Sequence, residues 1–465
     1  MPGHAGNDKF LIMEKESNSK YNRQPSFSRV IKKYAAALTG VVFILMSLFI
    51  VNNIPVKYTR MIWSDAEAYY DYLPYTFIKK DIAHMHYAVP LPGGNRLNKV
   101  TMGVAMMELP FFLAAHAYSK IQDLGADGYS FPYQVALLIS ISVYMFLGLF
   151  VLFKILRPRF EKKTAFFTVA ALFFASNLYY YTFCEPGLSH GYSFFMLTLF
   201  LFRLDYFIKN PNIKNTLLCG IPLAWATLIR PTNILYVILF LLYEVYSVRQ
   251  LKERLSFIGK NLRYFFIFLI LGILFYIPQI MYWSYVWGKL KIYGYVAADM
   301  QPETFAYLTS PKIFKVLFGV ESGWLVYTPF FIFFFIGLII TLVKKLHHSF
   351  AILIIFLLIL YLNASWWSYT FACSFGYRSL IEFYPLFAFP VAFLFSRIFA
   401  SRHIILKTLM MLLIVVFSFF NIRISGFYYK DPCWEVPQWT WNHYRKIIIK
   451  AFYIQPDLKL KEWRE

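Results

Sequence analysis

The sequence predicts an all-α, polytopic membrane protein with about 11 transmembrane helices. Apolar runs of about 20 residues recur along the chain, and a helix needs this length to cross a bilayer. The composition is 59% hydrophobic, 21% aromatic and only 15% charged, which is too apolar for an ordinary soluble domain. Lys and Arg gather in short loops between the apolar runs, as in proteins whose cytoplasmic loops are positively charged.

The first 33 residues are polar and basic, so they are expected to form a cytoplasmic tail. No cleavage site follows them, and 34–52 therefore reads as an uncleaved signal anchor. The transmembrane domain is expected over 34–421, followed by a short extracytoplasmic tail over 422–465. The expected spans lie near 34–52, 131–153, 164–183, 189–208, 215–229, 234–247, 264–287, 323–343, 349–363, 379–399 and 404–421.

A further apolar segment, 101–118, decides the topology. If it crossed the membrane, the basic loops at 154–163 and 248–263 would face outward, against the positive-inside rule. If it lies in the interface or dips back, every strongly basic loop faces the cytoplasm. We therefore expect the N-terminus inside, the C-terminus outside, and a long first outer loop over 53–130 with amphipathic helices on the membrane surface.

The formal net charge of +22 would suggest a nucleic-acid partner in a soluble protein. Here the position of the basic loops explains the charge by membrane orientation, so we expect membrane lipids and no nucleic acid as partners. The cysteines Cys184, Cys219, Cys373 and Cys433 lack metal-ligand spacing. All but Cys219 are expected outside, where a disulfide can form, although free buried thiols are the favoured prediction.

The first outer loop carries three carboxylates within seven residues, Asp65, Glu67 and Asp71. On a helix, Glu67 and Asp71 share a face while Asp65 points elsewhere. A carboxylate near apolar surface has a raised pKa and can take a proton near neutral pH. We expect Asp65, which lies closest to the first span, to act as a general base; the alternative is a solvated acidic loop.

Cations on the outer side oppose the usual charge bias and need another explanation. Arg96 and Lys99 precede 101–118, and Arg230 lies between two apolar segments. Such residues can bind a phosphate group at the membrane surface. The alternative is contact with lipid head groups by snorkelling side chains.

Two later outer turns hold further polar residues. Glu185 and His190 flank a Pro-Gly turn and could form a hydrogen-bonded pair or a site, although a metal would need more ligands. Arg378 and Glu382 are four residues apart at the start of a helix and could pair. Trp367 suits either an interfacial aromatic belt or stacking on a sugar ring.

The chain resembles the GT-C superfamily of integral-membrane glycosyltransferases, including bacterial mannosyltransferase-like and aminoarabinose-transferase-like enzymes. The resemblance rests on the long acidic first outer loop, the many spans that follow, and several short motifs. These motifs are Ser64-Asp65, Tyr69-Tyr70-Asp71-Tyr72-Leu73-Pro74, Asn98-Lys99, Leu109-Pro110-Phe111-Phe112, Arg230-Pro231-Thr232-Asn233 and Ser374-Phe375-Gly376-Tyr377-Arg378.

The resemblance implies an inverting transfer of a monosaccharide from a polyprenyl-phosphate donor to a glycan, lipid or protein acceptor. It implies Asp65 as the base and Lys99, Arg230 and Arg378 as donor-phosphate ligands. It also implies an active site on the outer face of the inner (plasma) membrane and no required cofactor; a divalent metal is left open without support. The other candidates for substrate binding are Glu67, Asp71, Arg96, Glu185, His190, Trp367 and Glu382.

Some features depart from known subfamilies. Asp65-Ala66-Glu67 replaces the Asp-Glu pair of protein O-mannosyltransferases, and the Lys-Pro-Pro-Leu run of aminoarabinose transferases is absent. The sequence therefore does not define the acceptor. One alternative is a transporter or lipid-linked sugar flippase, which would place charges midway along its spans and on both faces. The other is a polysaccharide polymerase or ligase, which would favour a large outer loop late in the chain.

Overall fold

The computed structural model describes residues 39–46, 48, 61–296, 303–430, 433 and 439–452. The chain divides into two units, 1–46 and 47–465. In the first unit, residues 39–46 are helical. The expected cytoplasmic tail, much of the signal anchor 34–52 and much of the C-terminal tail lie outside the described residues.

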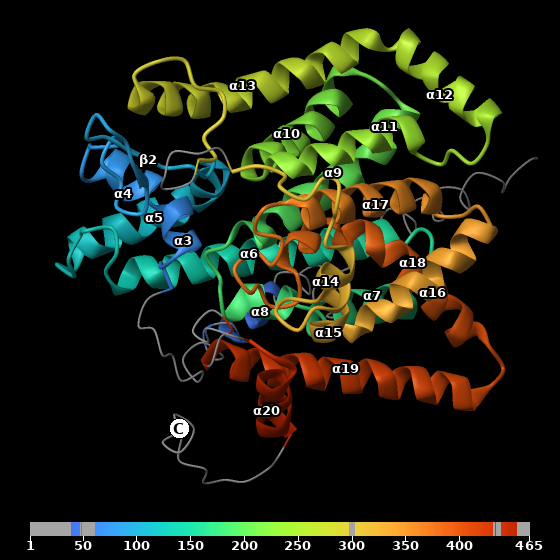
Figure 1. Cartoon of the computed structure of the whole chain (residues 1–465). Coiled ribbons are helices and arrows are strands. Elements are labelled where there is room, and N and C mark those ends of the chain that lie inside the picture. Colours follow the sequence, from blue (N-terminus) through green and yellow to red (C-terminus); the bar gives the residue numbers. More distant parts are fainter. Residues whose placement is uncertain are drawn as a thin grey trace, which may run out of the picture. The chain divides into compact units, whose positions relative to one another are not determined.

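The described residues of the second unit are mostly helical with almost no strand, which agrees with the predicted all-α class (Figure 1). Its one small sheet pairs β1 (Val89–Pro90) antiparallel with β2 (Arg96–Leu97). The helices are α3 (Asp65–Tyr70), α4 (Tyr72–Phe77), α5 (Gly103–Ile121), α6 (Phe131–Leu156), α7 (Lys162–Phe174), α8 (Leu178–Phe183), α9 (Ser189–Lys209), α10 (Ile213–Ile229), η1 (Pro231–Val237), α11 (Ile238–Leu242), α12 (Val248–Lys260), α13 (Leu262–Trp287), α14 (Ile313–Phe318), α15 (Trp324–Tyr327), η2 (Pro329–Phe331), α16 (Ile332–Val343), α17 (Ser349–Ser365), η3 (Arg378–Phe383), α18 (Tyr384–Ala400), α19 (Ile404–Lys430) and α20 (Trp441–Phe452).

Five helical segments in the described residues are long and apolar enough to cross a membrane. They are Phe131–Leu156, Ser189–Lys209, Leu262–Trp287, Arg378–Ala400 and Ile404–Tyr429. Four shorter apolar helices, Ile213–Ile229, Pro231–Leu242, Pro329–Val343 and Ser349–Ser365, overlap other expected spans. The chain is therefore a helical membrane protein, while the number of spans stays a prediction.

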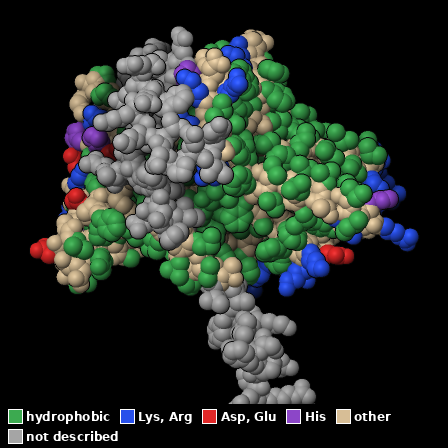
Figure 2. All heavy atoms as spheres, turned by 90° about the horizontal axis from the view of Figure 1, so that it is seen from below, with side chains coloured by type: hydrophobic (Ala, Val, Ile, Leu, Met, Phe, Trp, Pro, Cys, Tyr) green, Lys and Arg blue, Asp and Glu red, His purple; other side chains and the backbone are tan. Residues whose placement is uncertain are grey.

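The outer surface of the helices is hydrophobic, as contact with lipid requires. On α13, Leu269, Ile273 and Ile277 are exposed, and on α19 Leu412 and Val415 are exposed. Figure 2 shows one face on which hydrophobic side chains predominate and Lys and Arg lie near the margin. Without a bilayer around them, these apolar side chains would face water.

Helix α9 lies at the centre of the bundle and packs against α6, α10 and η3. Helix α10 packs in turn against α13, whose final turns contact β2 and whose start contacts α12. Figure 1 shows the same order, with α3, α4 and β2 at one end of these helices and α12 at the other. The long helices therefore connect two separate ends of the unit.

The expected span 164–183 is interrupted. Helix α7 ends at Phe174 and α8 begins at Leu178, with Asn177 between them. The side chain of Asn177 donates to the carbonyls of Phe375 and Gly376 and accepts from Tyr384. The break thus supplies the hydrogen bonds that hold the loop before η3.

The first outer loop contains helices, as expected: α3, α4 and α5. Helix α5 packs against α6, and its buried Glu108 accepts a hydrogen bond from Tyr192 of α9 (2.8 Å). A Cβ on Gly103 would lie 2.6 Å from the backbone of Ile229, so only glycine allows this close approach of α5 to the end of α10. The charge pattern predicts that 101–118 lies in the interface or dips back, and this stays a prediction.

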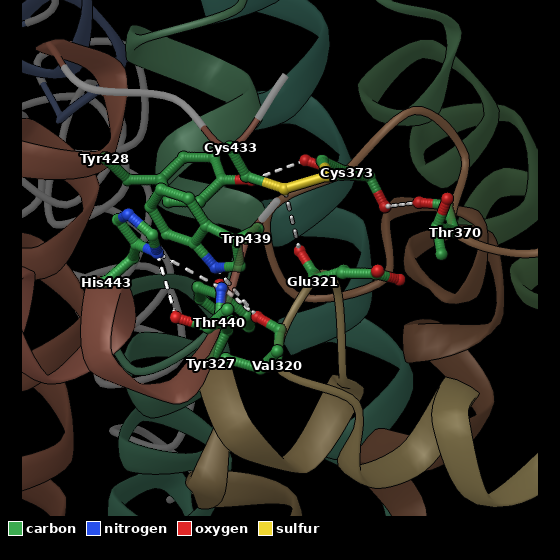
Figure 3. The surroundings of a disulfide bond; sticks show 11 residues. Val320, Glu321, Tyr327, Thr370, Cys373, Tyr428, Cys433, Trp439, Thr440 and His443 are labelled. Atoms are coloured by element: carbon green, nitrogen blue, oxygen red, sulfur yellow. Dashed lines mark hydrogen bonds between the residues drawn. A yellow bond between two sulfur atoms is a disulfide. The ribbon is translucent and has the colours of Figure 1, made fainter. Parts of the chain in front are cut away.

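A disulfide joins Cys373 to Cys433, whose Cα atoms are 5.6 Å apart, and Figure 3 shows its surroundings. The prediction of free thiols is wrong for this pair, because sequence does not show that the loop after α17 meets the end of α19. The prediction of free, buried thiols is confirmed for Cys184 and Cys219. Tyr428 donates a hydrogen bond to the carbonyl of Cys373 beside the bridge.

Candidate functional site

Asp65 lies in the first turn of α3, and the start of α6 fixes the backbone that precedes it. The side-chain oxygen of Gln134 accepts hydrogen bonds from the backbone N–H groups of Met61 (2.7 Å) and Ile62 (2.9 Å). Ser64 then adopts a positive φ of 53°, which turns the chain into α3. The carboxylate is favourably placed because the first turn of a helix presents unpaired N–H groups.

The Asp65 carboxylate binds Arg378 directly. Nη2 of Arg378 lies 2.6 Å from Oδ2 of Asp65, and the two side chains are 15% and 44% exposed. Gly376 and Tyr377 both have positive φ values, and this turn presents Arg378 at the start of η3. Burial tends to raise the pKa of Asp65, but the adjacent Arg378 outweighs burial and holds the pKa below its ordinary value.

Two predictions are wrong here. The pKa of Asp65 is lowered, not raised, because a guanidinium contacts it. Arg378 and Glu382 do not pair with each other, because Arg378 binds Asp65 and Glu382 binds other residues. The reason is local: η3 is a 3₁₀ helix with about three residues per turn, so positions four apart do not share a face.

A cavity of about 260 Å³ opens beside this ion pair. Four chain segments line it: the start of α3 with the residues before it, the loop before β1, the turn before α9, and the loop before η3. The lining residues are Met61, Trp63, Ser64, Asp65, Ala66, Tyr87, Glu185, Gly187, Leu188, Ala372, Ser374 and Arg378. The cavity therefore combines two carboxyl groups and a guanidinium with apolar walls.

Glu185 is the second acid of the cavity and is 9% exposed. It accepts a hydrogen bond from Tyr180 (3.0 Å), not from His190, so the predicted Glu185–His190 pair is absent. Burial raises the pKa of Glu185 to about 7, although Arg378 and the Tyr180 hydrogen bond act in the opposite direction. Glu185 therefore changes charge near neutral pH while Asp65 stays ionised.

Behind the cavity wall lies a buried cluster of Arg230, His190 and Glu382. Arg230 Nε and His190 Nδ1 lie 3.0 and 2.9 Å from the same carboxylate oxygen of Glu382. Arg230 Nη1 also lies 3.4 Å from Ser189 Oγ. Because Glu382 follows Arg378 within η3, the cluster and the cavity belong to one region.

Lys99 lies near enough for its charge to contribute to the lowered pKa of Asp65. Its ammonium group forms an ion pair with Glu303, and the two side chains are 36% and 7% exposed. The preceding residue is fixed, since Asn98 is buried and donates to the carbonyl of Ala68 on α3 (2.6 Å). Lys99 is thus held beside α3 with a partly exposed charge.

The remaining candidates lie outside the cavity. Asp71 is fully buried and accepts from Tyr129 (2.6 Å) and from the backbone of Tyr87 (3.1 Å). Arg96 donates to three backbone carbonyls and so shapes the first outer loop. Glu67 pairs with His86 at 2.6 Å, and Trp367 is 46% exposed. These contacts are structural, and none of these four residues lines the cavity.

Sequence patterns do not identify three residues that position the site: Glu303, Tyr180 and Gln134. Glu303 carries a weak signal, since it is an acid in an expected outer loop. Tyr180 and Gln134 carry none, because each lies within an apolar run and acts only through its tertiary contact.

A metal site is not evident in the described part of the chain. No group of three or more His, Cys, Asp or Glu residues described there is placed to hold a metal ion. The two carboxyl groups at the cavity have Arg378 and Tyr180 as partners instead.

No protein-family model matches the chain, and no curated protein matches its sequence. The chemistry of the cavity and its neighbouring cations is therefore the basis for inferring an activity.

Proposed function

We propose that the chain is a GT-C-like membrane glycosyltransferase that moves a monosaccharide from a polyprenyl-phosphate donor to an extracytoplasmic acceptor. The supporting observation is the Asp65–Arg378 ion pair at the wall of a cavity, with Lys99 and Arg230 nearby. A base for the acceptor hydroxyl and cations for the donor phosphate are the two requirements of such a transfer.

Arg378 is the main ligand for the donor phosphate in this proposal. A guanidinium presents donors in a planar fork that matches phosphate oxygens. Its buried Nε has no hydrogen-bond partner among the described residues, so the side chain has donor capacity beyond its bond to Asp65. A phosphate that bound the whole planar fork would compete with Asp65 for Arg378.

This competition couples donor binding to base strength. While Arg378 holds Asp65, the carboxylate is a weak base. When Arg378 turns to the phosphate, the effect of burial on Asp65 is no longer opposed by a full ion pair, and its pKa rises. The base thus strengthens only when the donor is present.

The chemical step is a direct displacement. The acceptor oxygen forms a bond to the anomeric carbon as Asp65 takes the hydroxyl proton. The bond between the anomeric carbon and the phosphate oxygen breaks, and the polyprenyl phosphate leaves with the electron pair. Arg378 stabilises the charge on the leaving phosphate, with Lys99 or Arg230 as further cations. Attack from the opposite face inverts the anomeric centre.

We assign the cavity to the extracytoplasmic side because of the distribution of basic loops. It adjoins the start of α6, where Gln134 binds the chain before Asp65. The other end of α6 leads into the basic loop 154–163, which the positive-inside rule assigns to the cytoplasm. A lipid-linked donor held in the membrane can present its phosphate at this outer end.

A lipid-linked sugar flippase is the second candidate. Buried Glu108, bonded to Tyr192, is an acid within the helical bundle, as a translocation path requires. In vesicles, a flippase would move the labelled donor between leaflets without breaking its sugar–phosphate bond.

The test is turnover of the donor by purified protein in proteoliposomes. Polyprenyl-phosphate mannose, glucose and aminoarabinose, each labelled in the sugar, are incubated with protein and an envelope extract as acceptor. The proposal expects release of polyprenyl phosphate and a product of inverted anomeric configuration. Intact donor in every mixture, with translocation between leaflets, would favour the flippase.

A further inference from the structure

A second cavity, of about 250 Å³, lies at the opposite end of the long helices. It is formed by the end of α6 with its following loop, the end of α9, and parts of α11 and α18. His348, just before α17, closes one side. The polar residues that line it include Lys154, Arg159, Asp205, Lys209, Tyr243 and His348.

The helix lengths place this cavity at the other membrane boundary. On α9, Ser189 contacts Arg230 near the first site, while Asp205 lines the second cavity. The 16 intervening steps span about 24 Å at the rise of an α-helix. This is close to the hydrocarbon thickness of about 30 Å. The loops that supply Arg159, Lys209 and His348 are those that the positive-inside rule assigns to the cytoplasm.

The cavity has an excess of positive charge. Lys154, Arg159 and Lys209 line it, but Asp205 is the only acid among its lining residues. That carboxylate lies 2.9 Å from Lys209 and 3.6 Å from Arg159, and it also accepts from Tyr243. One carboxylate cannot neutralise three cations, so an anion of fitting size would be attracted.

His348 supplies a second, independent sign of a ligand. Its side chain is 3% exposed, and its Nδ1 has no hydrogen-bond partner among the described residues. The ring packs 4.2 Å from Tyr243 and 5.4 Å from Phe389, centroid to centroid. Burial lowers the pKa of His348 to about 3, so the ring is neutral and has one N–H to donate. A buried ring nitrogen without a partner is unusual unless a ligand or water completes it.

We propose that this cavity binds the phosphate of an anionic phospholipid head group, through Arg159 with Lys154, Lys209 and His348. A lipid is favoured over free phosphate because the remaining walls are apolar, with Leu201, Leu239 and Leu386 among them. Basic pockets between transmembrane helices on the cytoplasmic side suit such head groups. The site is separate from the cavity of Asp65, and its test does not depend on glycosyl transfer.

The test compares lipid binding by the full chain in nanodiscs and by native mass spectrometry. The probes are phosphatidylcholine alone, phosphatidylcholine with phosphatidylglycerol, and inorganic phosphate. We expect the protein to retain phosphatidylglycerol and to melt at a higher temperature in its presence. Arg159→Gln should weaken retention roughly tenfold, since it removes charged hydrogen-bond donors to the phosphate. Arg159→Lys keeps the charge and should lose less.

Lys163→Gln is the matched control, because it removes one positive charge from the first turn of α7, close to Arg159 in sequence, at an exposed position outside the cavity. Equal retention of phosphatidylglycerol by Arg159→Gln and Lys163→Gln would overturn the proposal. So would equal retention of phosphatidylcholine and phosphatidylglycerol by the unchanged protein. Stabilisation by inorganic phosphate without any effect of the lipid would show a soluble anion as the ligand and reject the lipid.

Discussion

Arg378 of η3 forms an ion pair with Asp65 of α3, 2.6 Å apart, across 313 residues of sequence. This contact brings the first outer loop and the last third of the chain into one cavity. It also fixes the charge of both groups: the pKa of Asp65 falls below its ordinary value in spite of burial. In the proposed transfer, the same contact must open when donor phosphate arrives.

Replacing Arg378 tests its role toward the donor. Arg378→Lys keeps one positive charge but loses the planar fork, so KM for the polyprenyl-phosphate sugar should rise by roughly tenfold. Arg378→Gln should raise it further and also raise the pKa of Asp65, because the main charge that opposes burial is then lost and the charge of Lys99 remains. Initial rates over a range of donor concentrations measure this. Arg96→Gln, whose side chain binds backbone carbonyls outside the cavity, is the comparison. An unchanged KM in both Arg378 variants would remove this residue from the donor site.

The raised pKa of Glu185 should make the stability of the protein depend on pH. Its folded pKa of about 7 exceeds the ordinary 4.5, so between these values the folded state binds more protons than the unfolded state. The free energy of unfolding therefore falls as pH rises through this window, by on the order of 3 kcal/mol in total. Thermal unfolding between about pH 5 and about pH 8 should show this fall.

The control for this prediction is Glu185→Gln, which cannot ionise. Its melting temperature should change less over the same window and should exceed that of the unchanged protein at the alkaline end. Parallel curves for the two proteins would show that Glu185 titrates at its ordinary value.

A side chain at Gly187 should displace α3 by a steric clash. A Cβ at this position would lie 2.4 Å from the Cβ of Ala66, next to Asp65. Gly187→Ala should therefore displace α3, with a loss of about 1–3 kcal/mol in stability and a larger loss of transfer activity. Gly259→Ala on α12 is the control, because a Cβ there meets nothing within 4 Å. If both variants melt and turn over alike, α3 does not depend on this contact.

The Cys373–Cys433 bridge should stabilise the loop that ends at Arg378. Its sequence separation is 60, and closing a loop of this length contributes roughly 2–4 kcal/mol. Reductant should lower the melting temperature of the unchanged protein but leave that of the Cys373→Ser/Cys433→Ser double variant unaltered. Cys184 and Cys219 remain in both proteins, so any reductant effect on the double variant would assign the loss to another cause.

Much of the helical architecture could be predicted from sequence, because apolar runs are a direct consequence of the lipid environment. The charge pattern predicts one side of the membrane for Asp65, Lys99, Arg230 and Arg378, and these residues lie in one region of the structure. The partners of these charged groups could not be predicted from the sequence. Lys99 binds Glu303 and Arg230 binds Glu382, and such pairings arise only from the packing of distant segments.

The errors have the same origin. The lowered pKa of Asp65 depends on Arg378, whose proximity no local pattern reveals. Arg96 is a phosphate candidate by sequence, but three backbone carbonyls of the segment before β1 accept hydrogen bonds from it. Asp71 is a substrate-binding candidate by sequence, but it is buried, accepts a hydrogen bond from Tyr129 and does not line the cavity. Sequence patterns indicate which groups are unusual, whereas tertiary contacts decide which of them stay available.

The central claim is that Asp65 takes the acceptor proton during glycosyl transfer, and the rate of polyprenyl-phosphate release by Asp65→Asn tests it most directly. The account predicts a fall of about 10²–10⁴-fold in kcat, since Asn keeps the size of Asp but cannot accept the proton. Asp81→Asn, which alters an exposed acid of the same loop paired with His84, should keep the full rate. A folded Asp65→Asn protein that releases polyprenyl phosphate as fast as Asp81→Asn would contradict the account.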